Sequence, residues 1–191
     1  MFFKICPVIF LLNISESFYR RIICGKNPAP IWVLKKLFDY DPNLSKVAYN
    51  KEIYFTARNT KDILPKAINP QLAYYIGYLH GDGHVSKSSK KVSFTEKYLK
   101  QIALIKKLTK IIFNVTGSVY TKKSIIGNSY YVLDIRRVTI NSFFSEIMGI
   151  RRGRRESNSI PPIIKENKEL LKWYLCGLFD AEGAMPLHPK N

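Results

Sequence analysis

The chain of 191 residues is poor in cysteine, and the three that it has show no pattern. Cys6, Cys24 and Cys176 have neither the paired spacing of a disulfide framework nor the spacing of metal ligands. The sequence therefore gives no basis for a disulfide-stapled secreted domain or for a cysteine-ligated zinc site. An odd, scattered set of cysteines is typical of proteins in a reducing compartment.

Long apolar runs are also scarce. Residues 1–14 are mostly apolar but are interrupted by Lys4 and Pro7, and they are too few to span a bilayer. A secretory signal is one alternative, although no clear small-x-small cleavage site follows. A misassigned start is another, and it would require an alternative start codon because the next methionine is Met148. We expect a protein that is not secreted.

Acidic residues are few: 14 Asp and Glu stand against 31 Lys and Arg, for a net charge of +17. The excess is concentrated between residues 86 and 155, which hold 16 basic residues and only three acidic ones. Such a block predicts a surface that binds a polyanion. Charge alone leaves open a solubilising face, a ribosome-type protein or a membrane-surface protein.

Two similar segments stand on either side of this basic block. Tyr75–Gly83 reads YIGYLHGDG and Leu175–Gly183 reads LCGLFDAEG, and both are predicted to be helical. Gly77 and Gly81 lie four residues apart, as do Gly177 and Ala181, so each helix has one face of small residues. We expect the two helices to pack closely through these residues.

Each repeated segment ends in one carboxylate, Asp82 or Glu182, followed by glycine. Gly83 and Gly183 suit the left-handed conformation that commonly ends a helix. An anion at a helix C-terminus is disfavoured by the helix dipole, so stability alone does not explain an acid at both tips. A divalent cation bound between the two tips would explain them.

These segments resemble the two signature motifs of LAGLIDADG homing endonucleases, especially the archaeal single-chain (DOD) type. The resemblance implies that the motif helices form an interface between pseudo-symmetric halves. It also implies that Asp82 and Glu182 are catalytic and bind the metal ions. Asp180 matches an earlier acid of the motif, and His80 occupies that place in the first copy.

The remaining pattern fits this resemblance. Asn69-Pro70 predicts the start of a helix that runs to Asp82. Strands are predicted at 84–86, 92–95, 118–123 and 129–137, and helices at 98–113, 140–148 and 165–182. In the last strand Tyr131, Leu133 and Ile135 alternate with Tyr130, Val132, Asp134 and Arg136, so one face packs and the other is free to meet a ligand. The predicted fold class is α+β: an αββαββα half-domain plus the first helix of a second half.

In the family, the sheet of each half-domain lies in the DNA major groove. The resemblance therefore implies double-stranded DNA as the partner, with contacts from the sheet, its first turn and a basic linker. A shift of one residue in strand facing would exchange the choices on the sheet. The candidate DNA-binding residues are Lys87, Lys90, Lys91, Lys122, Lys123, Tyr130, Arg136, Arg151, Arg152, Arg154 and Arg155.

Thr95-Glu96-Lys97 resembles a Thr-Gln-Lys segment of the family, which implies an electrostatic catalytic role for Lys97. Glu96 stands where the family has Gln and is a further metal or water ligand in this interpretation. The alternative is that both are ordinary surface residues at the start of a helix. Oxygen ligands beside phosphate point to Mg²⁺, with Mn²⁺ as a substitute. The expected metal-binding positions are Asp82, Glu182, Gly81, Ala181 and Glu96.

The expected domains are an N-terminal extension (1–68), a first half-domain (69–159) and the start of a second (160–191). We expect the second sheet to be missing, and a homodimer or a separate chain to supply it. The predicted function is site-specific, metal-dependent cleavage of double-stranded DNA in intron or intein homing, in a cytoplasmic, nucleoid-associated protein. An intein proper is disfavoured, since no splicing residues flank the chain. A non-cleaving RNA maturase or DNA-binding regulator is the alternative.

Overall fold

The computed structural model describes residues 13, 15–23, 33, 36, 39, 54–57, 60–65, 67–153 and 159–182. Near its N-terminus the chain forms helix α2 (Glu16–Ile23) and an antiparallel hairpin of β1 (Tyr54–Ala57) and β2 (Thr60–Ile63). Neither α2 nor this hairpin is among the elements expected from the sequence. The sequence also indicates a plausible helix at 31–38, and that segment lies almost entirely outside the described residues.

The predicted half-domain is present with its elements in the expected order, which confirms an α+β fold. The elements are α5 (Pro70–Asp82), β3 (Gly83–Val85), β4 (Val92–Glu96), α6 (Leu99–Phe113), β5 (Ser118–Lys123), β6 (Ser129–Ile135), α7 (Val138–Ser142) and the π-helix η1 (Phe143–Ile147). Two further helices follow, α8 (Pro162–Lys165) and α9 (Lys168–Glu182). Asn69 caps α5 by accepting a hydrogen bond from the Leu72 backbone N–H at 2.9 Å, as its position before Pro70 predicts.

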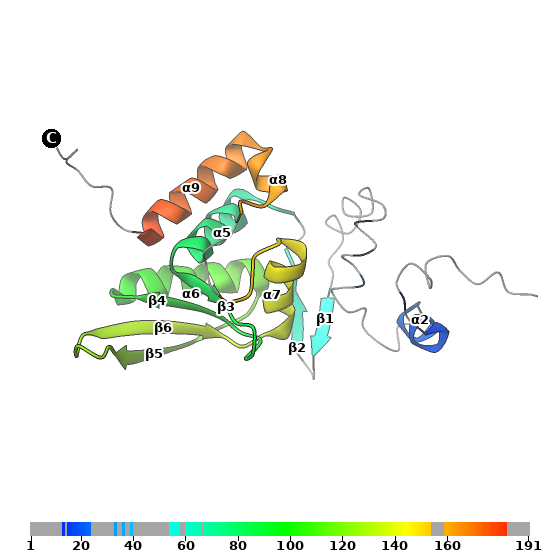
Figure 1. The fold of residues 1–191 in the computed structure, drawn as a ribbon, viewed down its shortest axis with the longest axis horizontal. Helices are drawn as coiled ribbons and strands as arrows, with labels where there is room; N and C mark the ends of the chain where they lie inside the picture. The colour runs from blue at the N-terminus through cyan, green and yellow to red at the C-terminus, as the bar shows by residue number, and fades with distance from the viewer. Residues whose placement is uncertain are drawn as a thin grey trace, which may run out of the picture.

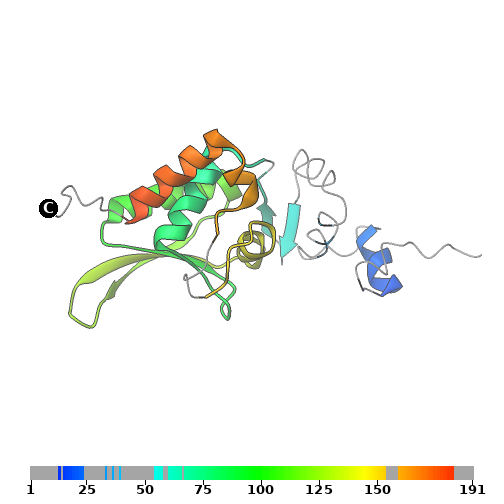
Figure 2. The ribbon, with the colours of Figure 1, turned by 45° about the horizontal axis from the view of Figure 1, so that its top comes forward.

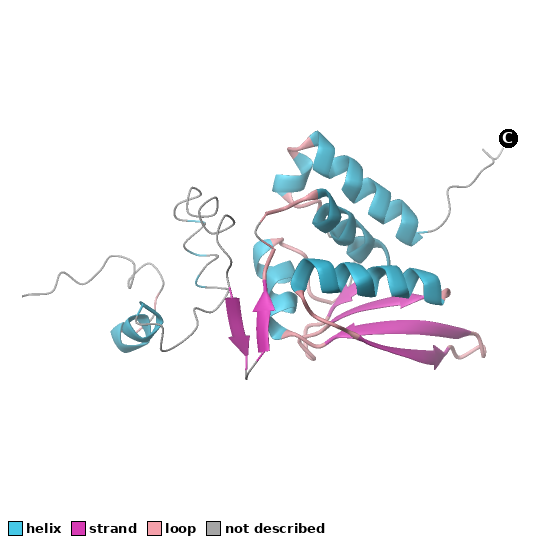
Figure 3. Ribbon diagram, turned by 180° about the vertical axis from the view of Figure 1, so that it is seen from behind, coloured by secondary structure: helices cyan, strands magenta, loops and turns pink. Residues whose placement is uncertain are grey.

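The four strands form one antiparallel sheet in the order β3-β4-β6-β5. Within the described part of the chain, helices cover one of its faces, and the opposite, open face carries none (Figures 1 and 3). In the register, Val92 pairs with Ile135 and Phe94 with Leu133, and these four side chains are buried in the core. Their neighbours along each strand therefore point to the open face, which settles the facing of the sheet.

Aromatic rings join α5 to the rest of the core. Tyr75 contacts Phe94 and Phe113 edge to face and stacks on Phe144, with ring centroids 5.2 to 5.9 Å apart. Its hydroxyl group lies 2.9 Å from the Thr109 hydroxyl, so a polar atom in a fully buried position is satisfied. The first motif helix is thus anchored to the sheet and to α6.

Three details differ from the sequence predictions. Gly83 is extended (φ −90°, ψ 164°) and begins β3, so the expected left-handed conformation is wrong there. Glycine is required at that position because a Cβ would overlap with Leu79.

The helix expected at 140–148 is α7 followed by η1, where the wider π turn accompanies burial of both Phe143 and Phe144. The helix expected at 165–182 begins later because Asn167 caps α9.

The helices α5 and α9 cross with their backbones in contact. A Cβ on Gly77 would overlap with the carbonyl oxygen of Tyr174, and a Cβ on Gly177 would overlap with that of Tyr74. The two helices run in the same direction, so their C-terminal ends lie side by side (Figure 1). The crossing is reciprocal, as the repeat in the sequence suggests.

We predict that Gly77→Ala and Gly177→Ala each destabilise the protein by about 1–3 kcal/mol or more, because the added methyl group meets a backbone carbonyl group. Helix propensity by itself would favour alanine by about 1 kcal/mol, so a net loss isolates the steric effect. Chemical denaturation measures the change. Cys176→Ala, at an exposed position next to Gly177, is the control. A Gly177→Ala protein as stable as that control would contradict the prediction.

Candidate active site and nucleic-acid interface

The two motif acids lie at neighbouring helix tips. A Cβ on Gly81 would overlap with the Ala181 methyl group, so the positions just before Asp82 and Glu182 touch. Asp82 is half-buried and Glu182 is exposed. The structure thus brings the four predicted interface positions together and leaves both carboxylates at one end of the helix pair.

Glu96 lies beside the first of these acids. It is buried at the end of β4, so it is not an ordinary surface residue at a helix start. Its carboxyl group accepts a hydrogen bond from the Tyr78 hydroxyl and is hydrogen-bonded to Asp82. Burial, together with the adjacent Asp82 charge, raises the pKa of Glu96. In its protonated form Glu96 can donate to the Asp82 carboxylate.

The same neighbours perturb Tyr78. Burial, followed by the hydrogen bond to Glu96 and the negative charges of Glu96 and Asp82, raises the pKa of this phenol. Tyr78 therefore stays protonated at neutral pH and acts as a donor to Glu96. Sequence reasoning missed Tyr78, which reads as an apolar position of the motif. Its only signal is that it lies four residues before Asp82, on the same side of the helix.

Lys97 follows Glu96 directly and is exposed. Its backbone N–H donates to the Glu96 carboxylate, and its ammonium group lies 5.5 Å from the centre of the Tyr98 ring. The two neighbours thus differ: Glu96 is a buried acid that contacts Asp82, and Lys97 is an exposed cation at the edge of the site.

Two hydrogen bonds cross between the motif helices in matching positions. The Tyr74 hydroxyl donates to Asp180 Oδ2 at 2.7 Å, and the Tyr174 hydroxyl lies 2.7 Å from His80 Nδ1. Each tyrosine stands three residues before the motif glycine and faces the earlier polar position of the other motif. The repeat of tyrosine at positions 74 and 174 is the signal in the sequence from which this pair of hydrogen bonds could have been predicted.

His80 is the less solvated partner of these pairs. It is only 9% exposed, and its Nε2 has no hydrogen-bond partner among the described residues. Burial lowers the pKa of His80 from 6.5 to about 4. The histidine is therefore neutral at physiological pH, and this half of the crossing carries no charge.

The open face of the sheet holds part of the predicted DNA-binding set. Lys122 pairs with Tyr130 across β5 and β6 on this face, and Tyr120 lies beside them on β5. Lys123 pairs with Ser129 one position further on, so its side chain belongs to the opposite face. Lys122 and Lys123, both predicted to bind DNA, are thus placed on opposite faces by the pleat.

The turn between β3 and β4 presents Lys87 and Lys90, both exposed. Ser86 organises it by accepting hydrogen bonds from the backbone N–H and the hydroxyl of Ser89. The Asn141 amide donates to the carbonyl groups of Ser86 and Lys91, both at 3.0 Å, and so ties the ends of the turn to α7.

Lys91 is not an exposed cation like its neighbours. Its ammonium group forms a 2.7 Å salt bridge to Asp134 Oδ2, which also accepts a hydrogen bond from the Tyr120 hydroxyl at 3.1 Å. Arg136 lies 3.6 Å from the same oxygen and is mostly exposed. Asp134 is buried under this group, so it holds Lys91 and leaves Arg136 as the more accessible cation.

The basic linker is only partly described. Arg151 and Arg152 are exposed, and Arg152 forms a 3.2 Å salt bridge to Glu146. Arg154 and Arg155 lie outside the described residues, as does Gly183. The prediction that these arginines contact phosphate stays a prediction.

The donor set at the helix tips consists of carboxylate oxygens. No group of three or more His, Cys, Asp or Glu side chains suited to a metal comes together in the described ranges. One or two carboxylates suffice for Mg²⁺ when substrate phosphates and water complete its octahedral shell. Asp82 and Glu182, with Glu96 beside the first, therefore fit magnesium better than zinc.

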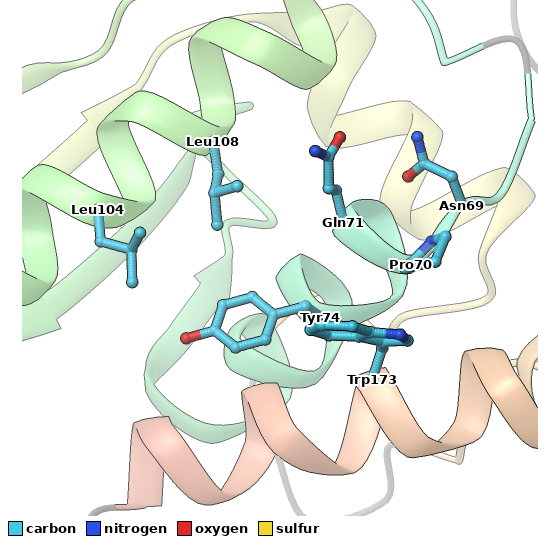
Figure 4. A pocket seen from close by; sticks show the side chains of 7 residues that line it. All are labelled: Asn69, Pro70, Gln71, Tyr74, Leu104, Leu108 and Trp173. Atoms are coloured by element: carbon cyan, nitrogen blue, oxygen red, sulfur yellow. The ribbon is translucent and has the colours of Figure 1, made fainter.

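An apolar groove of about 600 Å³ lies away from these acids, between α5, α6 and α9. Trp173 and Tyr74 face Leu104 and Leu108 across it (Figure 4). Its lining contains no charged residue, so it offers nothing to a phosphate or a metal ion. No helix among the described residues is long and apolar enough to cross a membrane.

Comparison with known proteins agrees with this architecture. Residues 69–148 match the family described as a LAGLIDADG-like domain. The chain therefore carries a LAGLIDADG-like domain, and the resemblance to LAGLIDADG homing endonucleases is confirmed. Glutamine–fructose-6-phosphate aminotransferase (isomerizing) of Methanocaldococcus jannaschii is 30% identical over 184 residues. The match covers 95% of this chain but only 16% of that relative.

We predict that His80 makes stability depend on pH. Its pKa is about 4 in the folded protein and about 6.5 in the unfolded chain, so only the unfolded chain takes up a proton between these values. Lowering the pH from about 6.5 to about 4 should therefore reduce the free energy of unfolding, by about 2–3 kcal/mol.

The measurement is the difference between the wild type and His80→Gln across this range, in metal-free buffer. The difference is needed because Glu96 acts in the opposite sense. Its raised pKa favours the folded state at low pH, and this contribution is lost as the pH rises through its folded value. Parallel curves for the two proteins would contradict the assignment to His80.

Proposed function

We propose that this chain provides one half of a metal-dependent, site-specific endonuclease of the homing type, acting on double-stranded DNA. The observation that carries the proposal is the reciprocal glycine crossing. It brings the tips of two parallel helices, with Asp82 and Glu182, to one end of a sheet whose open face is free and basic. A LAGLIDADG-like domain supports a nuclease of this kind.

In this proposal Asp82 and Glu182 would hold Mg²⁺ at the paired helix tips. The bound ion would activate water and stabilise the leaving 3′ oxygen. Glu96 keeps the Asp82 carboxylate in position through their shared hydrogen bond, and Tyr78 holds Glu96 in turn. Lys97 is exposed at the edge of the site and would add positive charge where negative charge develops on the phosphate during cleavage.

DNA binding is assigned to the open face and the ordered turn. Lys122, Tyr130 and Arg136 lie on this face, and Lys87 and Lys90 project from the turn that Asn141 fastens. These cations would contact phosphates and fix the register of the duplex. The adjacent Tyr120 and Tyr130 would meet base edges or sugars.

A partner surface is proposed on α9. Leu175 and Phe179 are 37% and 57% exposed, whereas their counterparts in the first motif, Tyr75 and Leu79, are buried beneath the half-domain. The repeat thus predicts that a second half-domain covers this face. A second copy of this chain, or a further polypeptide segment with a LAGLIDADG-like sheet, would supply it.

A non-cleaving nucleic-acid-binding protein, such as an RNA maturase or a DNA-binding regulator, is the second candidate. The observation in its favour is that, among the described residues, only the first motif acid has a sheet and a buried neighbour such as Glu96. The activity in the name of the aminotransferase is not proposed for this chain, which spans 16% of that protein.

We predict Mg²⁺-dependent cleavage of plasmids that carry a library of randomised duplex inserts. Sequencing of the linear products would reveal a common target if the enzyme is specific. Asp82→Asn should reduce the rate at least about a hundredfold, a loss of about 2.7 kcal/mol in transition-state stabilisation. Glu166→Gln, an exposed acid on the turn before α9, is the matched control and should cleave normally. A wild-type protein that retards DNA without cutting it would favour the second candidate.

We also predict that DNA affinity falls steeply with salt. The logarithm of the association constant should decrease linearly with the logarithm of salt concentration, with a slope of about −0.9 for each phosphate neutralised. Lys122→Ala should make this slope less negative by about 1. Lys107→Ala, exposed on α6, is the control and should leave the slope unchanged. Binding that did not respond to salt would refute the assignment of the basic face.

A further inference from the structure

The turn at the end of the β5–β6 hairpin has an unusual surface. Ile125 and Ile126 occupy it and are 107% and 82% exposed, the two highest values among the exposed large apolar residues in the described part of the chain. The hairpin extends beyond the layer of helices, so its tip stands away from the body of the domain (Figure 2). Isolated exposed apolar residues need no explanation, but an adjacent pair at the tip of a projecting hairpin does.

The turn itself does not require isoleucine. The Gly127 backbone N–H donates to the Ser124 carbonyl at 2.9 Å, and Gly127 has a φ of +87°, a conformation that favours glycine. The Ser124 N–H donates to the Asn128 carbonyl at 2.8 Å and its hydroxyl accepts from the Asn128 N–H. Small polar residues fill the positions of Ile125 and Ile126 in most turns. Since Ser124 and Gly127 define the turn, the isoleucines serve neither its geometry nor the core.

The charge around the tip indicates the partner. From residue 97 to residue 133 the chain contains no acidic residue and seven lysines, five of them at or on α6 and two on the hairpin. Two of these lysines, Lys122 and Lys123, precede the turn directly, and Tyr130 follows it across from Lys122. An apolar tip on a basic hairpin matches a polyanion that also offers apolar surface, and the stacked bases of a DNA duplex provide this.

We propose that Ile125 and Ile126 form a wedge that enters a groove of the bound duplex and partly unstacks a base step. Apolar side chains used in this way kink DNA because they replace base stacking at the inserted step. The inference rests on the proposed function, since it assumes that the sheet binds duplex DNA. Lys122 holds a phosphate beside the opened step, and the ordered turn keeps both isoleucines in position.

The test uses a duplex rich in TA steps, which unstack readily, with 2-aminopurine in these steps and a donor–acceptor dye pair at its ends. The wild-type protein should raise the 2-aminopurine fluorescence and shorten the distance between the ends. Ile125→Ser/Ile126→Ser should lose both effects. Its affinity should fall by no more than roughly tenfold, because phosphate contacts supply most of the binding free energy.

Matched variants separate the wedge from general effects. Ile125→Leu/Ile126→Leu keeps the apolar bulk and should retain the fluorescence change. Ile111→Ser, at an exposed apolar position on α6, should behave as wild type. The serine variant should fold normally because its substitutions fall in an exposed turn, and circular dichroism checks this.

Several outcomes would overturn the inference. A serine variant that unstacks and bends DNA like the wild type would remove the role of the isoleucines while leaving the proposed function intact. Isoleucine-dependent binding to phosphatidylglycerol/phosphatidylcholine vesicles, with unchanged DNA distortion, would assign the tip to a lipid surface. A wild-type protein that does not bind duplex DNA at any salt concentration would refute the proposed function and the wedge together.

Discussion

The contact between the backbones of α5 and α9 is the constraint on which the rest of the site depends. Gly77 and Gly177 each face a carbonyl group of the other helix, so a side chain at either position would push the helices apart. The same approach brings Gly81 against Ala181 and the acids that follow them to one place. Since interiors are closely packed, even one methyl group at the crossing would alter the separation of the two carboxylates.

The crossing is symmetric in its backbone but not in its chemistry. Tyr74 reaches Asp180, and Tyr174 reaches His80, in equivalent positions. One pair therefore contains a carboxylate near the surface, and the other a buried neutral histidine. The difference is explained by burial. Helix α5 lies between α9 and the rest of the half-domain, where an unpaired charge would be costly. The exposed side of α9 permits an acid. The departure of His80 from the repeat thus has a physical reason within the described structure.

Much of the fold could be predicted from the sequence because its signals are local. The cap at Asn69-Pro70, the alternation in β6 and the repeated small residues each specify a nearby geometry. What could not be predicted depends on contacts between distant elements. The environment of Glu96 depends on Tyr78 and Asp82, which α5 brings beside it. The salt bridge of Lys91 depends on Asp134, which lies on another strand. The sequence position of Gly83 predicts a left-handed helix end, whereas glycine is required there because a Cβ would overlap with the backbone and side chain of Leu79.

The carboxylates and the candidate phosphate contacts lie on elements of different rigidity. Asp82 ends a helix that is fixed on one side by α9 and on the other by the aromatic cluster around Tyr75. Lys87, Lys90 and Lys122 instead lie on a turn and on a projecting hairpin, where substitutions disturb little of the core. Affinity for a polyanion can therefore change without moving the acids. The reverse does not hold, because a change at the crossing displaces α5 and, through Tyr75, the sheet that carries those lysines.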